Sequence, residues 1–167
     1  MTRLFVAIEI PDELKKRIFE EMVKPLNGLK SVKEENLHAT LCFMEDEKES
    51  EIIEKLRKIK GKTFEADITQ TGHFGDRVIW VGIESDEFEG LYEKVHEALR
   101  IKTDHRFSGH ITLARGNDSG NFFKEFLKIR DKSIFESFLI EKITLFRSVL
   151  TKNGPVYEKV EDFYLEE

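Results

Sequence analysis

Hydrophobic and polar positions follow two rhythms along this chain, one typical of strands and one typical of helices. Residues 3–11, RLFVAIEIP, are rich in β-branched and aromatic types, which predicts a strand. From Asp12 the apolar residues recur at spacings of three and four, which predicts a helix that ends at Asn27-Gly28. The rest of the first half predicts a strand at residues 36–43, a helix over residues 52–59 and a strand at residues 64–68.

The second half of the chain repeats this order of elements. It predicts a strand at residues 77–85, a helix over residues 88–99, a strand at residues 107–115, a helix over residues 122–127 and one long or two short strands between residues 135 and 149. Two copies with so long a period do not make a solenoid, so we interpret the chain as a duplicated lobe. The prediction is one domain, residues 1–167, made of two lobes at approximately 1–75 and 76–167 that are related by a pseudo-twofold axis.

Composition narrows the classes of function. With 167 residues, 40% hydrophobic and 36% charged, the chain can bury one sizeable core. The net charge of −6 argues against stable binding to duplex nucleic acid, because such binding depends on neutralising phosphates with Lys and Arg. A small or terminal phosphate needs only a locally positive pocket. The single Cys and the lack of a signal-peptide pattern or a long apolar run predict a cytoplasmic protein with no membrane contact, and we expect a monomer.

One short motif occurs at the same place in both halves. The segments NLHATLCF and FSGHITLAR each contain His-x-Thr-Leu, with His38 and Thr40 in the first and His110 and Thr112 in the second. Because side chains on a strand alternate between faces, each His shares a face with its Thr. A pseudo-twofold axis would place the two pairs on opposite walls of one groove. A single copy has little specificity, and its structural interpretation is a half-buried His that is bonded to the neighbouring Thr.

Two histidines that face one point suit displacement at phosphorus. A neutral imidazole accepts a proton and an imidazolium donates one, and the ordinary pKa of about 6.5 makes both forms available near neutral pH. The attacking and leaving oxygens lie on opposite sides of phosphorus, so a base is needed at one end and an acid at the other. The hydroxyls of Thr40 and Thr112 can donate hydrogen bonds to the remaining phosphate oxygens.

Taken together, these segments resemble a known family. Paired His-x-Thr motifs in a duplicated chain are similar to those of the two-histidine (2H) phosphoesterases. Within that superfamily the chain resembles the bacterial and archaeal RNA 2′,3′-cyclic phosphodiesterases of the LigT type, formerly described as 2′-5′ RNA ligases. The resemblance covers nearly the whole chain and rests on RLFVAIEIP, NLHATLCF, RVIWVGI, HITLAR and RSVLTKNGPVYE, in that order. Gly109 departs from the family, which usually has proline before the second His.

The resemblance implies both a fold and a reaction. The implied fold is α+β, with two pseudo-symmetric lobes, each an antiparallel sheet with two helices on its outer face, that enclose a central cleft. The implied enzyme is a hydrolase of RNA processing that converts 2′,3′-cyclic phosphates at RNA 3′ ends, or in small cyclic nucleotides, to 2′-phosphates. His38 would protonate the leaving 3′ oxygen and His110 would deprotonate water. No metal and no other cofactor is expected.

Further residues are needed to bind the phosphate and the base. Arg115 is the first candidate cation, because a guanidinium pairs well with phosphate oxygens. Strict alternation from His110, however, points Arg115 to the opposite face, so it reaches the site only if the strand ends or twists there. We take Phe5 as the candidate that stacks a terminal base, as aromatic residues do in proteins that bind single-stranded RNA. Other candidates are Arg147, Lys152, Phe43, Phe74 and Tyr157.

Two more residues have chemistry that a structural role explains better. Cys42 shares the parity of His38 and is interpreted as a small core residue. His96 lies among charged residues of a predicted helix and is expected to be exposed. Neither completes a zinc site, because a single Cys is available.

Other functions stay open on the sequence alone. The same residues suit a module that binds an RNA end or a nucleotide phosphate without turnover. They also suit a cyclic nucleotide phosphodiesterase, a 2′-5′ RNA ligase in which a hydroxyl replaces water, or an inactive scaffold.

Overall fold

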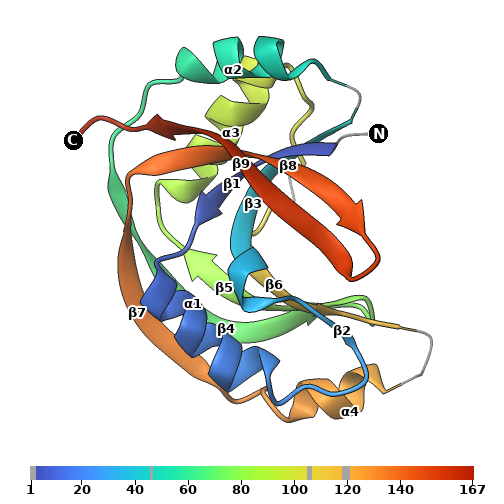
Figure 1. Ribbon diagram of the computed structural model, residues 1–167. Helices are drawn as coiled ribbons and strands as arrows, with labels where there is room; N and C mark the ends of the chain where they lie inside the picture. Colours follow the sequence, from blue (N-terminus) through green and yellow to red (C-terminus); the bar gives the residue numbers. More distant parts are fainter. Residues whose placement is uncertain (1–2, 46, 105–106, 118–120) are drawn as a thin grey trace.

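The computed structural model describes residues 3–45, 47–104, 107–117 and 121–167, and its strands form two antiparallel sheets (Figure 1). Sheet A contains, in spatial order, β3 (His38–Glu45), β1 (Arg3–Glu9), β8 (Lys142–Thr151) and β9 (Gly154–Tyr164). Sheet B contains β2 (Lys30–Ser31), β6 (His110–Arg115), β5 (Val78–Glu84), β4 (Phe64–Phe74) and β7 (Ser133–Ile140). The predicted α+β class is therefore confirmed.

Helices cover both sheets. Around sheet A, α2 (Glu49–Arg57) and α3 (Phe88–Leu99) pack against each other and contact β9 and β3. Around sheet B, α1 (Asp12–Ile18) runs directly into the π-helical turn η1 (Phe19–Val23), which contacts β6. The short α4 (Phe122–Leu127) is followed by a turn whose Ile129 carbonyl accepts a hydrogen bond from Thr71 of β4. Among the described residues, no helix is long and apolar enough to cross a membrane.

The two sheets do not correspond to the two halves of the sequence. Sheet A takes β1 and β3 from the first half and β8 and β9 from the second, while sheet B joins β2 and β4 to β5, β6 and β7. The predicted boundary between lobes at residues 75 and 76 instead falls in the tight turn between β4 and β5, which are paired neighbours. The physical reason is the long backbone ladder between β1 and β8, which ties the C-terminal hairpin to the first strand. Each half of the chain therefore contributes to both sheets.

The local sequence explains most of the helices and strands, and it also explains why β9 and β2 were not predicted. The stripe predicted for α3 is buried as expected, and consists of Phe88, Leu91, Tyr92, Val95 and Leu99. The segment predicted as one or two strands between residues 135 and 149 is two strands, β7 and β8. Strand β9 was not predicted because its exposed and half-buried residues lack a strong apolar run. Strand β2 has only two residues, and its pairing with β6 alone defines it.

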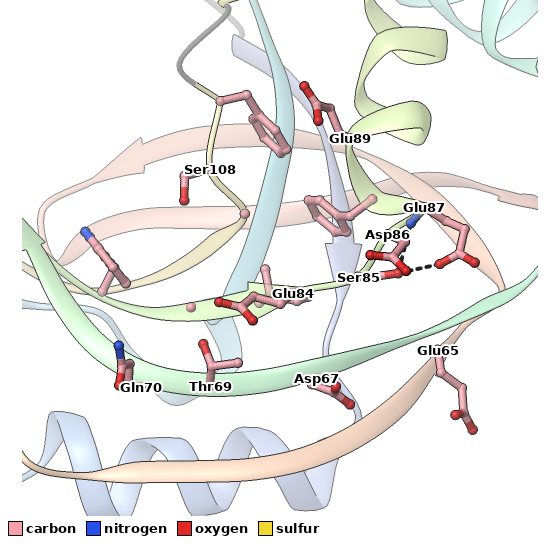
Figure 2. A pocket seen from close by; sticks show the side chains of 16 residues that line it. Glu65, Asp67, Thr69, Gln70, Glu84, Ser85, Asp86, Glu87, Glu89 and Ser108 are labelled. Atoms are coloured by element: carbon pink, nitrogen blue, oxygen red, sulfur yellow. Dashed lines mark hydrogen bonds between the residues drawn. The ribbon is translucent and has the colours of Figure 1, made fainter.

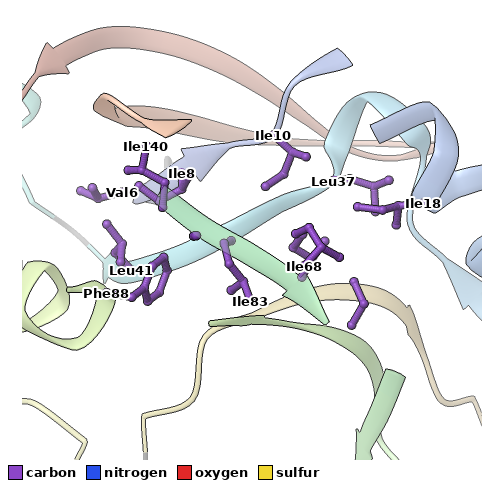
Figure 3. Close-up of a cluster of buried hydrophobic side chains, with 14 of the residues drawn as sticks. Val6, Ile8, Ile10, Ile18, Leu37, Leu41, Ile68, Ile83, Phe88 and Ile140 are labelled. Atoms are coloured by element: carbon purple, nitrogen blue, oxygen red, sulfur yellow. The ribbon is translucent and has the colours of Figure 1, made fainter. Parts of the chain in front are cut away.

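The hydrophobic core joins the two sheets. Val6 and Ile8 of β1, Ile83 of β5 and Phe88 at the start of α3 belong to one buried cluster (Figure 3). Because neighbouring residues on a strand point to opposite sides, burying one face of β3 and β6 leaves the other face for His38, Thr40, His110 and Thr112, all of which are half-buried. We call this second face the histidine face of each sheet.

Candidate active site

His38, the first residue of β3, is held in one orientation. Its Nδ1 lies 2.6 Å from the carbonyl oxygen of Asn36, and a carbonyl can only accept, so Nδ1 carries the proton. Its Nε2 lies 2.8 Å from the Thr40 hydroxyl, which donates to the neutral ring. Burial is the main reason that the pKa of His38 is lowered to about 4, and the nearby charges of Lys15, His110 and Arg115 contribute to that shift. In the free protein His38 is therefore neutral near pH 7, with the lone pair on Nε2.

His110, the first residue of β6, is held in the same way. Its Nδ1 donates to the carbonyl of Ser108 at 2.8 Å, which again is the carbonyl two residues before the His. Burial also lowers the pKa of His110, and the charge of Arg115 acts in the same direction. The duplication therefore extends beyond residue type to the tautomer: each ring presents Nε2 as the nitrogen that can exchange a proton.

The two histidines belong to different sheets but lie in one region of the molecule. The backbones of β3 and β6 approach each other although they share no ladder. The charge of Arg115, and that of His110 when its ring is protonated, act on His38, and Arg115 also acts on the hydroxyl of Tyr157 from β9. Residues of both histidine faces are thus close enough to interact electrostatically.

A β-bulge in each strand decides which side chains join the histidines. In β6, Thr112 pairs with Trp80 and Ala114 pairs with Ile79, so Leu113 has no partner across the ladder. The extra residue shifts the alternation, and Arg115 pairs with Val78 on the histidine face. The bulge is therefore the local departure from strict alternation that the sequence analysis required for Arg115 to reach this face.

The same bulge occurs in β3. Thr40 pairs with Ala7 and Cys42 pairs with Val6, so Leu41 is the extra residue. The shift places Cys42 in the core, where the residue is 3% exposed, and brings the 64% exposed Phe43 onto the histidine face. The parity between Cys42 and His38 that the sequence indicated does not exist. Phe43 and Arg115 occupy equivalent positions in the two repeats.

Each bulged carbonyl has a partner outside the ladder. Leu113 accepts a hydrogen bond from the backbone N–H of Val32, at 2.9 Å. Leu41 accepts one from Nε2 of His96, also at 2.9 Å. His96 is 7% exposed, so the prediction that it is exposed is wrong. Its role is to fix the back of β3.

Phe5 lies beside His38 but offers no free surface for a base. Its ring is 5.0 Å from the His38 ring and stacks on Phe146 at 5.2 Å. The edge of Tyr157 meets it at 4.9 Å, and the side chain is only 2% exposed. Phe5 therefore buttresses His38 in the free protein, which is a correction to its predicted role in stacking. Tyr157, half-buried and 5.3 Å from the His38 ring, is an aromatic residue that borders the site on this side.

Aromatic residues also border His110. The exposed ring of Phe74 meets the His110 ring edge-on at 5.0 Å, and Trp80 lies 6.4 Å from it. Trp80 was not predicted as a site residue. The signal for it is its place in β5 directly opposite Thr112, which the sequence alone does not give. Gly109, at the position where proline is usual, lies so close to β5 that a Cβ would stand 2.7 Å from the carbonyl oxygen of Ile83.

Other predicted cations lie elsewhere or are already paired. Arg147 pairs with Leu4 on the face of sheet A opposite to His38, and its guanidinium binds Glu49 at 2.7 Å and Glu158 at 2.9 Å. Lys152 lies in the turn between β8 and β9. Within the described residues, no carboxylate lies within ion-pair distance of Arg115, whose side chain is exposed. Arg115 is thus available to an anion.

A pocket of about 630 Å³ opens on sheet B, at the two residues that precede His110 in the sequence (Figure 2). Its lining includes Trp80, Gln70, Ser108 and Gly109. Acidic side chains make up much of the remainder, namely Glu65, Asp67, Glu84, Asp86, Glu87 and Glu89. Across the described parts of the chain, no three His, Cys, Asp or Glu side chains are arranged to hold a metal ion.

Comparisons with known proteins identify the family. The profile of the 2′-5′ RNA ligase superfamily matches residues 10–151. The RNA 2′,3′-cyclic phosphodiesterase of Methanocaldococcus jannaschii is 31% identical, over 96% of this chain and 99% of that protein. The protein of the same name from Thermotoga maritima is also 31% identical, over 93% of this chain and 91% of its own length.

Solved structures agree with this result. TT0787 of Thermus thermophilus superposes with a TM-score of 0.78 at 28% identity and covers 97% of each chain. Escherichia coli LigT complexed with 3′-AMP gives a TM-score of 0.83 at 21% identity over 99% of each chain, which shows a common fold. With its paired His-x-Thr strands, the chain belongs to the 2′-5′ RNA ligase superfamily, whose members include the 2H phosphoesterases of the LigT type.

Proposed function

We propose that the protein hydrolyses RNA 2′,3′-cyclic phosphate ends to 2′-phosphates without a metal ion, with His38 and His110 as the acid and base. The observation that carries the proposal is the matched pair of imidazoles on β3 and β6, each with Nδ1 fixed by a backbone carbonyl and Nε2 able to exchange a proton. The names of the relatives, which are 31% identical over most of the chain, supply the substrate class.

The proton transfers follow from this arrangement. Nε2 of neutral His110 takes a proton from water as the water oxygen bonds to phosphorus. The bond between phosphorus and the 3′ oxygen breaks, and protonated His38 gives its Nε2 proton to that oxygen, which leaves a 2′-phosphate and a free 3′-hydroxyl. Arg115 and the hydroxyls of Thr40 and Thr112 donate hydrogen bonds to the non-bridging oxygens of the phosphate.

The lowered pKa values set a condition on this mechanism. Neutral His110 suits the base, but His38, with a pKa of about 4 in the free protein, must gain a proton to act as the acid. A bound phosphate raises the pKa of His38, because its negative charge stabilises the imidazolium and opposes the effect of burial. The acid therefore forms together with the substrate complex.

The test is hydrolysis of an oligonucleotide that ends in a 2′,3′-cyclic phosphate, in the presence of a chelator. Wild-type protein should release the 2′-phosphate, and His38→Ala or His110→Ala should each lower kcat by at least about 100-fold, because each removes a general acid or base. Phe135→Leu, a 72% exposed residue of β7, is the matched control and should act like wild type. Full activity in both histidine variants, or activity that chelator abolishes, would contradict the proposal.

A second substrate separates the two roles. When the leaving group is a nitrophenolate, it departs without a proton, so the general acid becomes dispensable. His38→Ala should then recover most of its lost activity relative to wild type, whereas His110→Ala should not. The reverse pattern would assign the acid to His110.

The family also favours a second candidate reaction. Its profile is that of 2′-5′ RNA ligases, and ligation follows when a 5′-hydroxyl takes the place of the attacking water. Adding RNA with a 5′-hydroxyl to the same assay measures the ratio of joined to hydrolysed product. Hydrolysis is the main reaction that we propose, because water is present at far higher concentration.

A further inference from the structure

We propose that Lys30, beside Arg115, binds the phosphodiester that joins the terminal nucleotide to the rest of an RNA chain. The site therefore favours an RNA end over a free cyclic nucleotide. The inference deepens the proposed function and rests on it for the cyclic phosphate at the histidines. It gives a role to β2, the two-residue strand at the edge of sheet B.

Two cations face each other at this edge of sheet B. Lys30 of β2 and Arg115 of β6 are direct register partners, so both side chains lie on the histidine face. Both are exposed, and among the described residues neither has a carboxylate within ion-pair distance. Like charges directly opposite each other destabilise a sheet. Bound anions remove this cost, so the pair is suited to a ligand that carries phosphate groups.

The two cations can serve two successive phosphates. Arg115 is the proposed cation for the reacting phosphate, and the backbone of Lys30 lies one strand further out, about 4.8 Å away. The ammonium of a lysine stands on a flexible four-carbon stem and reaches further still. In an RNA chain, the anion next to the terminal cyclic phosphate is the phosphodiester on the 5′ side of the same ribose. A nucleoside 2′,3′-cyclic phosphate lacks this group and cannot use Lys30.

A third cation near the histidines also has no carboxylate beside it. Lys15 of α1 is half-buried, and its charge adds to the effect of burial in lowering the pKa of His38. Two residues later on the same helix, Arg17 is paired with Glu21 and Glu136. In the part of the chain that the structure describes, Lys15 has no such pair. A chain with a net charge of −6 thus keeps uncompensated cations around its histidines.

Charges of the opposite sign lie at the other end of β5. Asp67 and Glu84 are direct register partners, and both line the pocket on this face of sheet B (Figure 2). Val78, the partner of Arg115, and Glu84 are the two ends of β5, about 20 Å apart at 3.3 Å for each residue. The carboxylates repel a phosphodiester backbone. The RNA chain therefore leaves the site over β2 and not over the pocket.

The test compares two forms of adenylyl-adenosine 2′,3′-cyclic phosphate, one with the natural phosphodiester link and one with an uncharged methylphosphonate link. The link of the second form has no negative charge and is otherwise nearly the same in shape. We expect wild-type protein to hydrolyse the natural form with about fivefold higher kcat/KM, as for an exposed ion pair. The ratio should fall as salt is added. Equal kcat/KM for the two forms would overturn the inference.

Two variants and a control assign the effect to one residue. Lys30→Ala should bring the ratio of the two kcat/KM values to about one, whereas Lys30→Arg keeps the charge and should preserve the ratio. Lys58→Ala removes the same charge from an exposed position at the end of α2 and should keep the wild-type ratio. Each ratio is taken within one variant, so effects common to both substrates cancel. A wild-type ratio in Lys30→Ala would contradict the role of Lys30.

Binding without turnover separates this inference from the proposed function. Adenylyl-adenosine 3′-phosphate with each of the two links is titrated by calorimetry, and wild-type protein should bind the natural form about fivefold more tightly. A protein that shows this preference but hydrolyses no cyclic phosphate refutes the proposed function alone. A protein that hydrolyses both cyclic forms at the same kcat/KM, and binds both links equally, refutes the role of Lys30 alone.

Discussion

Single residues set the protonation chemistry of this site. Both histidines are oriented by the carbonyl two residues earlier in the chain, so a local backbone contact, present in each repeat, fixes which nitrogen faces the substrate. Burial beneath Phe5 and Tyr157 keeps His38 neutral in the free protein. Because the folded protein holds His38 neutral, its free energy of unfolding should fall when the pH drops.

The stability of the protein should therefore depend on His38. Its pKa is 6.5 in the unfolded chain and about 4 in the folded one, so the folded state binds fewer protons between these pH values. The stability is fully present above pH 6.5 and is lost as the pH falls towards 4. At 1.36 kcal/mol for each pH unit, the linked loss comes to about 3 kcal/mol.

The variant His38→Gln has no titrating group at this position. Between pH 7 and pH 4 its free energy of unfolding should fall by about 3 kcal/mol less than that of wild type, measured by urea unfolding at each pH. Carboxylates elsewhere titrate in both proteins and cancel in the difference. Parallel pH profiles would show that His38 does not titrate as the structure indicates.

At the scale of elements, the two β-bulges assemble the site. Each inserts one leucine, Leu41 or Leu113, and thereby rotates the next residues of the strand. The carbonyls of these two leucines accept hydrogen bonds from His96 and Val32, respectively, in place of bonds across the ladder. Without the bulge in β6, Arg115 would point towards the core face and the phosphate would lack its cation.

This placement predicts different effects for two arginines. Arg115→Ala should raise KM for the cyclic phosphate by about 10- to 100-fold, since charge-assisted hydrogen bonds are worth about 1.5–3 kcal/mol. Arg147→Ala, on the opposite face of sheet A and bound to Glu49, should lower Tm with little change in KM. Steady-state kinetics of both variants make the comparison, and a similar KM in both would remove Arg115 from the phosphate site.

The sequence predicted the repeated parts of the site better than the unrepeated ones. His38, Thr40, His110 and Thr112 could be found because the motif occurs twice at matching places. The side of Arg115 could not, because a bulge depends on how two distant strands pair. The burial of Phe5 depends on Phe146 and Tyr157, which come from the other end of the chain. Trp80 is a site residue only through its register with Thr112.

At the scale of the whole molecule, the two halves of the chain are interleaved. Sheet A closes only when β8 pairs with β1, and the core that joins the sheets contains residues of both halves. Duplication was visible in the sequence, but the exchange of strands between the halves was not, because local patterns do not specify which strands pair. The monomeric state and the cytoplasmic location stay predictions.

Interleaving predicts that the halves cannot fold alone. A fragment of residues 1–75 lacks β8 beside β1, and a fragment of residues 76–167 lacks β4 between β5 and β7. Neither should unfold cooperatively in urea, while an equimolar mixture should regain the near-ultraviolet circular dichroism of the intact chain. The cut at Gly75 lies in an exposed turn and disturbs no ladder, so it is a mild one. Cooperative unfolding of either fragment by itself would contradict the prediction.

Phe43 and Arg115 occupy matching positions in the two repeats but differ in charge, so the two sides of the site are not equivalent. Each strand has one side-chain position on the histidine face just after its bulge. In β3 this position holds the apolar Phe43, and in β6 it holds the cationic Arg115. An anion that binds between the two strands therefore meets a positive charge on the side of β6 and an apolar ring on the side of β3. This pair of side chains is therefore one source of asymmetry between the two sides of the site.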